Sequence, residues 1–254
     1  MAAFYPLAYA AAEIGGARVD VRNLTPAGAE PHDLELSPRT VGELRSADVV
    51  VYLGRGFQPA VERAVEGAKG TAVDLLEELS LRPGEGSEAS DPHVWLDPLR
   101  YAELAKRIGT ALGRSSAARV FVARLHGLDR DYRSGLARCE RRDLVTSHAA
   151  FGYLAARYGL RQVPITGLSP EAEPSPRRLE RGVAEVRATG ATTVFAETLA
   201  SRRIAETVAR ETGARVAVLD PLEGLTEAEL DRGETYFSVM RANLAALRRG
   251  LGCS

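Results

Sequence analysis

The stretch Asp48-Val49-Val50-Val51-Tyr52-Leu53, followed by Gly54, is a nearly continuous apolar run. Such a run is typical of a strand that is buried on both faces of a parallel sheet. Upstream, Ser37-Pro38 has the N-cap and first-turn chemistry of a helix, and a second helix is predicted over 58–66. The tail of one strand and two further short strands are predicted over residues 2–6, 20–24 and 72–74. This alternation of strands and helices predicts an α/β fold.

The second half of the chain repeats the alternation. Strands are predicted over 144–146, 162–165, 193–196 and 215–219. Helices are predicted over 151–158, 176–189, 202–211 and 236–247. Two helices lie between the halves, over 101–108 and about 117–138, and we place the boundary between two lobes on the longer one. Two lobes suit a chain of 254 residues, because domains commonly contain about 100–150 residues. The predicted domains are an N-terminal α/β lobe, a linking helix and a C-terminal α/β lobe, over 1–116, 117–140 and 141–254.

Composition excludes some partners. The sequence is 45% hydrophobic and 26% charged with a formal net charge of -1, which gives no sign of binding to nucleic acid or to an anionic membrane. No apolar run approaches the roughly 20 residues that span a bilayer, and the first residues lack the features of a signal peptide. We expect a soluble chain whose export signal has been removed. Cys139 and Cys253 form no CxxC motif, so a disulfide depends on whether the fold brings them together.

The stretch Asp91-Pro92-His93-Val94-Trp95-Leu96-Asp97-Pro98 is the strongest candidate for a functional loop. It combines a histidine, two carboxylates and the only tryptophan with two prolines, which restrict the residues before them and make the loop stiff. Of the four histidines, His32, His93 and His148 lie in loops or at strand ends. His126 lies on the charged side of the long helix, so we expect it to face solvent and to bind nothing.

Three of the candidate side chains come shortly after predicted strands. They are His148, Glu197 and Asp220. In open α/β sheets, ligands bind beyond the carboxyl ends of the strands. If the two lobes face one another, His32 and His93 from loops of the first lobe can meet these residues in a cleft. Three neutral imidazoles and a carboxylate are suitable ligands for a divalent ion such as zinc.

Two other functions stay open at this point. A serine hydrolase is not favoured, because the sequence has no Gly-x-Ser-x-Gly motif, and the phosphate-loop and HExxH motifs are absent as well. A mononuclear zinc hydrolase would use three histidines as ligands and Glu197 or Asp220 as the base that acts on bound water. A cleft that binds a small organic solute would use the histidines as hydrogen-bonding groups.

Four separated motifs carry a family resemblance. They are Pro31-His32-Asp33, the 91–98 stretch, Ser147-His148-Ala149-Ala150-Phe151-Gly152-Tyr153-Leu154 and Leu219-Asp220-Pro221-Leu222. In order and spacing they resemble the solute-binding proteins of zinc and manganese ABC transporters. The resemblance extends from Phe4-Tyr5-Pro6-Leu7 to Met240-Arg241-Ala242-Asn243, which is essentially the whole chain.

The resemblance implies two α/β lobes, each with a mostly parallel sheet flanked by helices, joined by one long rigid helix. The metal would lie between the lobes and be handed to a membrane permease. By position, His32 and His93 are the expected ligands of the first lobe, and His148 and Asp220 those of the second. An imidazole at His148 favours zinc, because manganese prefers oxygen donors; a manganese or iron-binding member is the alternative. We expect no catalytic residues, an extracytoplasmic location, in the periplasm or lipid-anchored, and a monomer.

Three acidic residues lie near the proposed ligands, namely Glu30, Asp97 and Glu197. Each either orients a ligand imidazole by accepting its second N–H or only caps or solvates the end of a loop. The loop over 81–90 contains no histidine, so we do not expect it to collect metal. Because ligand histidines must be neutral, zinc affinity is predicted to fall below about pH 6.5.

Overall fold

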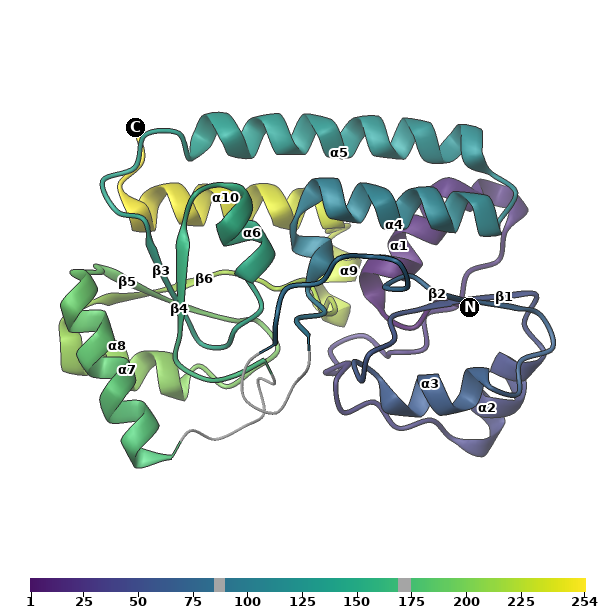
Figure 1. Cartoon of the computed structure of the whole chain (residues 1–254), viewed down its shortest axis with the longest axis horizontal. Coiled ribbons are helices and arrows are strands. Elements are labelled where there is room, and N and C mark those ends of the chain that lie inside the picture. The colour runs from purple at the N-terminus through teal and green to yellow at the C-terminus, as the bar shows by residue number, and fades with distance from the viewer. Residues whose placement is uncertain (85–89, 169–174) are drawn as a thin grey trace. The chain divides into compact units, whose positions relative to one another are not determined.

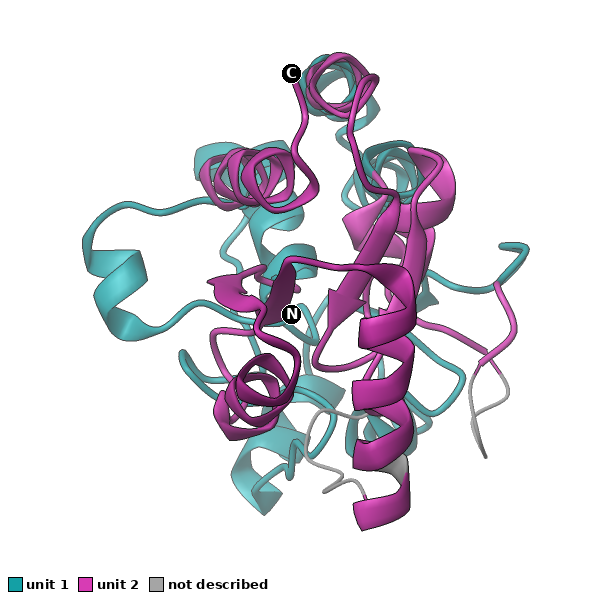
Figure 2. Cartoon of the chain, turned by 90° about the vertical axis from the view of Figure 1, so that its left-hand side faces the viewer, with its two compact units in different colours: residues 1–81, 98–127, 222–236 teal, residues 82–97, 128–221, 237–254 magenta. Residues whose placement is uncertain are grey.

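A computed structural model describes residues 1–84, 90–168 and 175–254 of the chain (Figure 1). The chain divides into two compact units, which are coloured separately in Figure 2. Unit 1 contains residues 1–81, 98–127 and 222–236, and unit 2 contains residues 82–97, 128–221 and 237–254. Each unit has parallel strands flanked by helices, so the predicted α/β class is confirmed. The continuous domain ranges stay a prediction, because compactness alone does not define a domain.

The sheet of unit 1 is small. Strands β1 (Val49–Tyr52) and β2 (Thr71–Asp74) pair in parallel. Ala2 adds only isolated parallel bridges to Val51 and Asn23, so the strands predicted over 2–6 and 20–24 are wrong. Helix α1 (Tyr5–Gly15) starts instead at this point, because Pro6 lies in its first turn, where a missing N–H does no harm, and the alanines that follow favour a helix.

The remaining helices of unit 1 mostly begin at a proline. They are α2 (Pro38–Arg45), α3 (Pro59–Val65), α4 (Pro98–Ala111) and the short α9 (Glu227–Asp231). Ser37 caps α2, as predicted, by accepting a hydrogen bond from the backbone N–H of Thr40. Helix α4 packs on α1, and the buried Tyr101 hydroxyl donates to the carbonyl of Pro6 at 2.5 Å. The buried face of α4 therefore holds the start of α1 in place.

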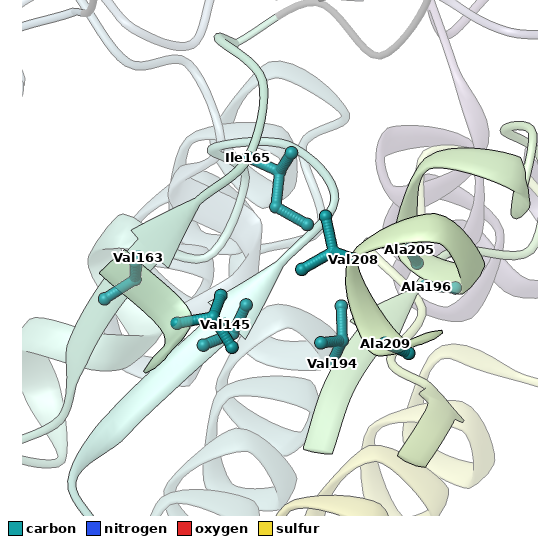
Figure 3. Close-up of a cluster of buried hydrophobic side chains, with 9 residues drawn as sticks. Val145, Val163, Ile165, Val194, Ala196, Ala205, Val208 and Ala209 are labelled. Atoms are coloured by element: carbon teal, nitrogen blue, oxygen red, sulfur yellow. The ribbon is translucent and has the colours of Figure 1, made fainter. Parts of the chain in front are cut away.

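The sheet of unit 2 is fully parallel. Its strands are β3 (Asp143–Thr146), β4 (Arg161–Pro164), β5 (Thr193–Ala196) and β6 (Arg215–Val218), in the spatial order β4-β3-β5-β6. Helices α7 (Pro176–Thr189) and α8 (Arg203–Thr212) pack against it. Small aliphatic side chains fill this core (Figure 3); they are Val145, Val163, Ile165, Val186, Val194, Ala196, Ala205, Val208 and Ala209. Because all four strands run in parallel, the residues that follow them emerge at one edge of the sheet.

Three more α-helices, a 3-10 turn over Gly16–Arg18 and a disulfide complete the described part of the chain. Helix α5 (Ser115–Gly135) starts in unit 1 and ends in unit 2, and α6 (Gly152–Arg157) lies in unit 2. Helix α10 (Tyr236–Leu251) begins at the last residue of unit 1 and continues in unit 2. Cys139 and Cys253, whose pairing the sequence left open, form a disulfide. Among the described residues, every helix is too short or too polar to cross a bilayer.

Candidate metal centre

His93 is fully buried in the proline-flanked loop of unit 2. Residues Val94–Leu96 form a single 3-10 turn, and Asp97 has the extended backbone predicted for a residue before proline. One carboxylate oxygen of Asp91, Oδ1, accepts the backbone N–H of His93 at 2.9 Å and lies 2.8 Å from its ring Nδ1. Asp91 therefore fixes both the backbone and the ring of this histidine.

His148 is fully buried at the carboxyl end of β3 in the same unit. Its backbone N–H donates to Glu197 Oε1 at 3.2 Å, and the same oxygen lies 2.5 Å from its ring Nδ1. Its carbonyl accepts from the Thr146 hydroxyl at 2.7 Å and from the Gln162 side-chain amide at 3.0 Å. Because Glu197 follows β5, the neighbour of β3, adjacent strands supply the histidine and its carboxylate.

The two imidazoles of unit 2 lie next to each other. Their ring centroids are 5.4 Å apart and their planes are inclined at 64°. In both rings Nδ1 faces a carboxylate oxygen, which favours the tautomer that carries its proton on Nδ1. Nε2 is then the nitrogen that would bind a metal, and such a carboxylate partner is the usual second contact of a metal-ligating histidine.

The roles of the predicted orienting residues differ in the structure. Glu197 lies against the ring of His148, whereas Asp97 forms an ion pair with Arg157, at 3.1 Å. The carboxylate on the His93 ring is Asp91, which sequence reasoning missed. Its position two residues before the histidine was the available signal, because an aspartate side chain commonly accepts the backbone N–H two residues later.

Asp220 follows β6 in unit 2 and is buried. Asn243 of α10 holds its backbone on both sides, accepting the Asp220 N–H at 2.9 Å and donating to its carbonyl at 2.7 Å. The Asp220 carboxylate accepts a hydrogen bond from the Thr198 hydroxyl at 2.7 Å. One carboxylate oxygen is thus already engaged by a neighbouring side chain.

His32 lies in unit 1. Glu30 accepts its backbone N–H at 3.2 Å, and its ring packs edge-on against Phe57, with the ring centroids 4.7 Å apart. Its Nε2 lies 3.5 Å from Oε1 of Glu223, a carboxylate that is only 1% exposed. Leu222, just before Glu223, has the left-handed φ of 56°, which is rare for a residue with a branched side chain.

Glu223 is the second acidic residue that sequence reasoning missed, because it lies just outside the Leu219-Asp220-Pro221-Leu222 motif. His126 is exposed on α5, as predicted. The prediction about the histidine-free loop over 81–90 falls largely on residues 85–89, which lie outside the described residues. So do residues 169–174 of the proline-rich loop before α7.

The fold and these side chains define an α/β protein suited to bind a transition-metal ion, since buried imidazoles held by carboxylates favour zinc and similar metals. The chain belongs to the family described as "ZnuA: Zinc-uptake complex component A periplasmic", whose profile matches residues 1–250. The family model and the relatives are described by zinc uptake and zinc binding and by no enzymatic activity, which favours a zinc-binding protein over the hydrolase alternative.

Individual relatives agree with this assignment. The zinc-binding protein AdcA of Streptococcus pyogenes serotype M6 is 34% identical over 96% of this chain, which spans only 54% of that relative. The high-affinity zinc uptake system protein ZnuA of Bacillus subtilis is 33% identical, with 98% of this chain and 86% of the relative covered. The chain therefore spans about half the length of its AdcA relatives and most of ZnuA.

Solved structures are similar along nearly the whole chain. The Zn(II)-bound ZnuA-like domain of Streptococcus pneumoniae AdcA has a TM-score of 0.85 at 35% identity, covering 98% of this chain and 97% of that one. The laminin-binding protein Lmb of Streptococcus agalactiae, described as a bifunctional adhesin and metal transporter, has a TM-score of 0.90 at 32% identity, with the same coverage of 98% and 97%.

Proposed function

We propose that this chain captures a zinc ion through His32, His93, His148 and one buried carboxylate, and delivers it to the permease of an ABC transporter. The observation that carries the proposal is the pair of buried imidazoles in unit 2, each with its Nδ1 against a carboxylate oxygen. This arrangement orients the Nε2 atoms of His93 and His148 as ligands before any metal arrives. Zinc is the cargo, and the protein performs no reaction on it.

Two carboxylates, those of Asp220 and Glu223, are candidates for the fourth ligand of the zinc ion. Asp220 is the ligand implied by the family motif, and its carboxylate accepts the Thr198 hydroxyl. Glu223 is buried and approaches the Nε2 atom of His32 to 3.5 Å, which supports a role close to the metal. Asp91 and Glu197 orient the imidazoles of unit 2, while Glu30 holds the backbone of His32.

Zinc is preferred over manganese or iron because the ligand set is rich in imidazole nitrogen. Zinc binds nitrogen donors well, whereas manganese prefers oxygen donors. The names of the relatives support this preference, since AdcA is described as zinc-binding and one similar domain was solved with Zn(II) bound. Manganese is the second choice.

The protein acts outside the cytoplasm, as one chain per zinc ion. The family is described as periplasmic, and the AdcA relative of Streptococcus pneumoniae serotype 4 is called a lipoprotein. The disulfide between Cys139 and Cys253 supports the same location, because disulfides persist mainly in oxidising compartments. Size-exclusion chromatography with light scattering tests the single-chain state.

Competition with a chromogenic zinc chelator tests the proposal. Metal-free wild type should bind one zinc ion tightly, and His148→Ala should weaken binding by at least about 100-fold, because a ligand and its oriented partner are lost together. His126→Ala, which removes an exposed histidine of α5, is the matched control and should bind like wild type. Equal affinities of the two variants would refute the assignment of His148.

Two further variants decide the fourth ligand. Asp220→Asn and Glu223→Gln each remove one negative charge with little change in shape, and the true ligand should show the larger loss of affinity. A small organic solute as the cargo is tested by thermal unfolding, since zinc at 100 times its dissociation constant should stabilise a zinc-binding protein by about 2.7 kcal/mol. No zinc-induced shift would favour the organic solute.

A further inference from the structure

We infer that Tyr153 and Arg157 of helix α6 are positioning residues for the zinc site, because they hold the loop that carries His93 at both of its ends. The inference rests on the proposed zinc-binding function. Neither residue is among the ligands or their carboxylate partners. Their effect on the metal would pass through the backbone of residues 91–97.

Tyr153 fixes the start of the loop. Its buried hydroxyl donates to the backbone carbonyl of Asp91 at 2.8 Å and accepts the backbone N–H of Arg82 at 2.8 Å. The preceding residue is Gly152, where an added Cβ would lie only 2.9 Å from Oδ2 of Asp91. The first turn of α6 therefore packs directly against the carboxylate that orients His93.

Arg157 fixes the end of the loop. Its Nε lies 3.1 Å from Oδ1 of Asp97 and 2.6 Å from Oδ1 of Asp129. Asp129 is held in turn by Arg133 at 3.0 Å and by the Tyr158 hydroxyl at 3.1 Å. Asp97 is thus connected through one guanidinium to the part of α5 that belongs to unit 2.

The middle of the loop has its own anchor. The indole N–H of the fully buried Trp95 donates to the carbonyl of Pro221 at 2.7 Å, next to Asp220. Tyr153, Trp95 and Arg157 together give the loop three fixed points. Because the loop is short and buried, its backbone can move little between these three contacts.

Helix α6 also follows His148 closely in the chain. This one short helix therefore helps to position both imidazoles of unit 2. The distance between the rings, 5.4 Å from centroid to centroid, then depends on the contacts of α6 with the loop. The distances between a metal and its ligand atoms vary by only about 0.2 Å in well-formed sites, so a small displacement of the loop should weaken zinc binding. This is why the hydroxyl of Tyr153 matters although it lies outside the ligand set.

Tyr153→Phe is the main test, with Tyr132→Phe as its matched control. The Tyr132 hydroxyl is also buried and also donates to a backbone carbonyl, that of Met240 at 2.6 Å, but it does not contact the loop. Tyr132→Phe loses one hydrogen bond to a backbone carbonyl, whereas Tyr153→Phe loses two, one to Asp91 and one from Arg82, so Tyr153→Phe should lose somewhat more stability in the metal-free state. Only Tyr153→Phe should weaken zinc binding, by about tenfold, which is the lower end for outer contacts of a metal site.

A spectroscopic measurement separates positioning from a general loss of stability. Co²⁺ bound in place of zinc has a visible absorption spectrum that reports ligand geometry. The spectrum should change in Tyr153→Phe and stay as in wild type in Tyr132→Phe. A zinc affinity and a cobalt spectrum of Tyr153→Phe equal to those of the control would overturn the inference, while the proposed zinc binding would stand.

A second pair of variants keeps the test decisive if Tyr153→Phe does not fold. Arg157→Lys keeps the charge but loses the planar group that joins Asp97 to Asp129. Arg161→Lys is the matched control, because the Nε of Arg161 forms an ion pair with Asp143 at 2.6 Å that includes neither Asp97 nor Asp129. Weaker zinc binding in Arg157→Lys alone supports the inference, and equal binding in both variants overturns it. Failure of the wild type itself to bind zinc would refute the proposed function, and this inference with it.

Discussion

Removal of the disulfide in the double variant Cys139→Ser, Cys253→Ser should destabilise the protein strongly. The two cysteines are separated by 114 residues in the sequence. In the chain-entropy description, opening a loop of this length gives the unfolded state about 4.8 kcal/mol of additional conformational freedom at 25 °C. The unfolding free energy of most domains is about 5–15 kcal/mol, so the expected loss is a large part of the total unfolding free energy.

The folded state should survive this change. Backbone hydrogen bonds hold the same two segments together next to the disulfide, from Glu140 N–H to the Gly252 carbonyl at 3.2 Å and from Ser254 N–H to the Arg138 carbonyl at 3.0 Å. The effect should therefore appear mainly in the unfolded state. An open unfolded chain exposes more surface, so the denaturant dependence of the unfolding free energy should also become steeper.

Urea denaturation of metal-free protein, followed by far-ultraviolet circular dichroism, measures both quantities. Oxidised wild type, wild type in excess reducing agent and the double variant are compared. The reduced wild type is the control, and it should unfold like the double variant, because both lack only the cross-link. A loss below about 1 kcal/mol in either form would refute the reasoning from loop length.

Three further predictions concern acid, the core and the metal. Burial raises the pKa of Asp129, but hydrogen bonds from Arg157 and Arg133 outweigh this and lower the pKa below its ordinary 3.8. Asp129→Asn should therefore lower the unfolding free energy by about 2 kcal/mol above about pH 4. In urea titrations at lower pH, the difference in unfolding free energy between wild type and variant should shrink, because the Asp129 carboxylate of wild type becomes protonated. Leu144→Ala, in the buried strand β3, should cost about 2–5 kcal/mol by the same assay, whereas Val120→Ala, at a side chain that is 66% exposed, should change stability by less than about 0.5 kcal/mol. Calorimetry should show zinc affinity falling below about pH 6.5, because protons compete with zinc for imidazole nitrogen; an affinity independent of pH would contradict imidazole ligands.

Much of the fold could be predicted because the local patterns agree with the final packing. Helix α7 and strand β5 have the predicted bounds, Pro176–Thr189 and Thr193–Ala196, since periodic apolar positions and flanking Pro or Gly define both elements. Helix α1 was missed because Pro6 near its start indicated a strand end. Whether a proline ends a strand or opens a helix depends on the packing of α1 against α4, which the local sequence does not contain.

The orienting carboxylates were harder to predict than the histidines. The Asp-Pro-His motif singled out His93, but the sequence alone does not show which of Asp91 and Asp97 faces its ring. The structure has Asp91 on the ring and Asp97 on Arg157, and the second contact depends on a helix that lies about 60 residues further along the chain. Glu223 was missed for a similar reason, since its partner His32 is distant in the sequence and the local pattern does not show this contact.

Each compact unit is assembled from three separate stretches of chain. The ribosome must therefore release residues 222–236 before the first unit has all its parts, and residues 237–254 before the second has its own. Proteins whose domains are continuous can fold them one after another during synthesis. Here the nascent chain carries two unfinished cores until residues 222–254 have been made, and a product truncated before residue 222 would contain neither unit whole.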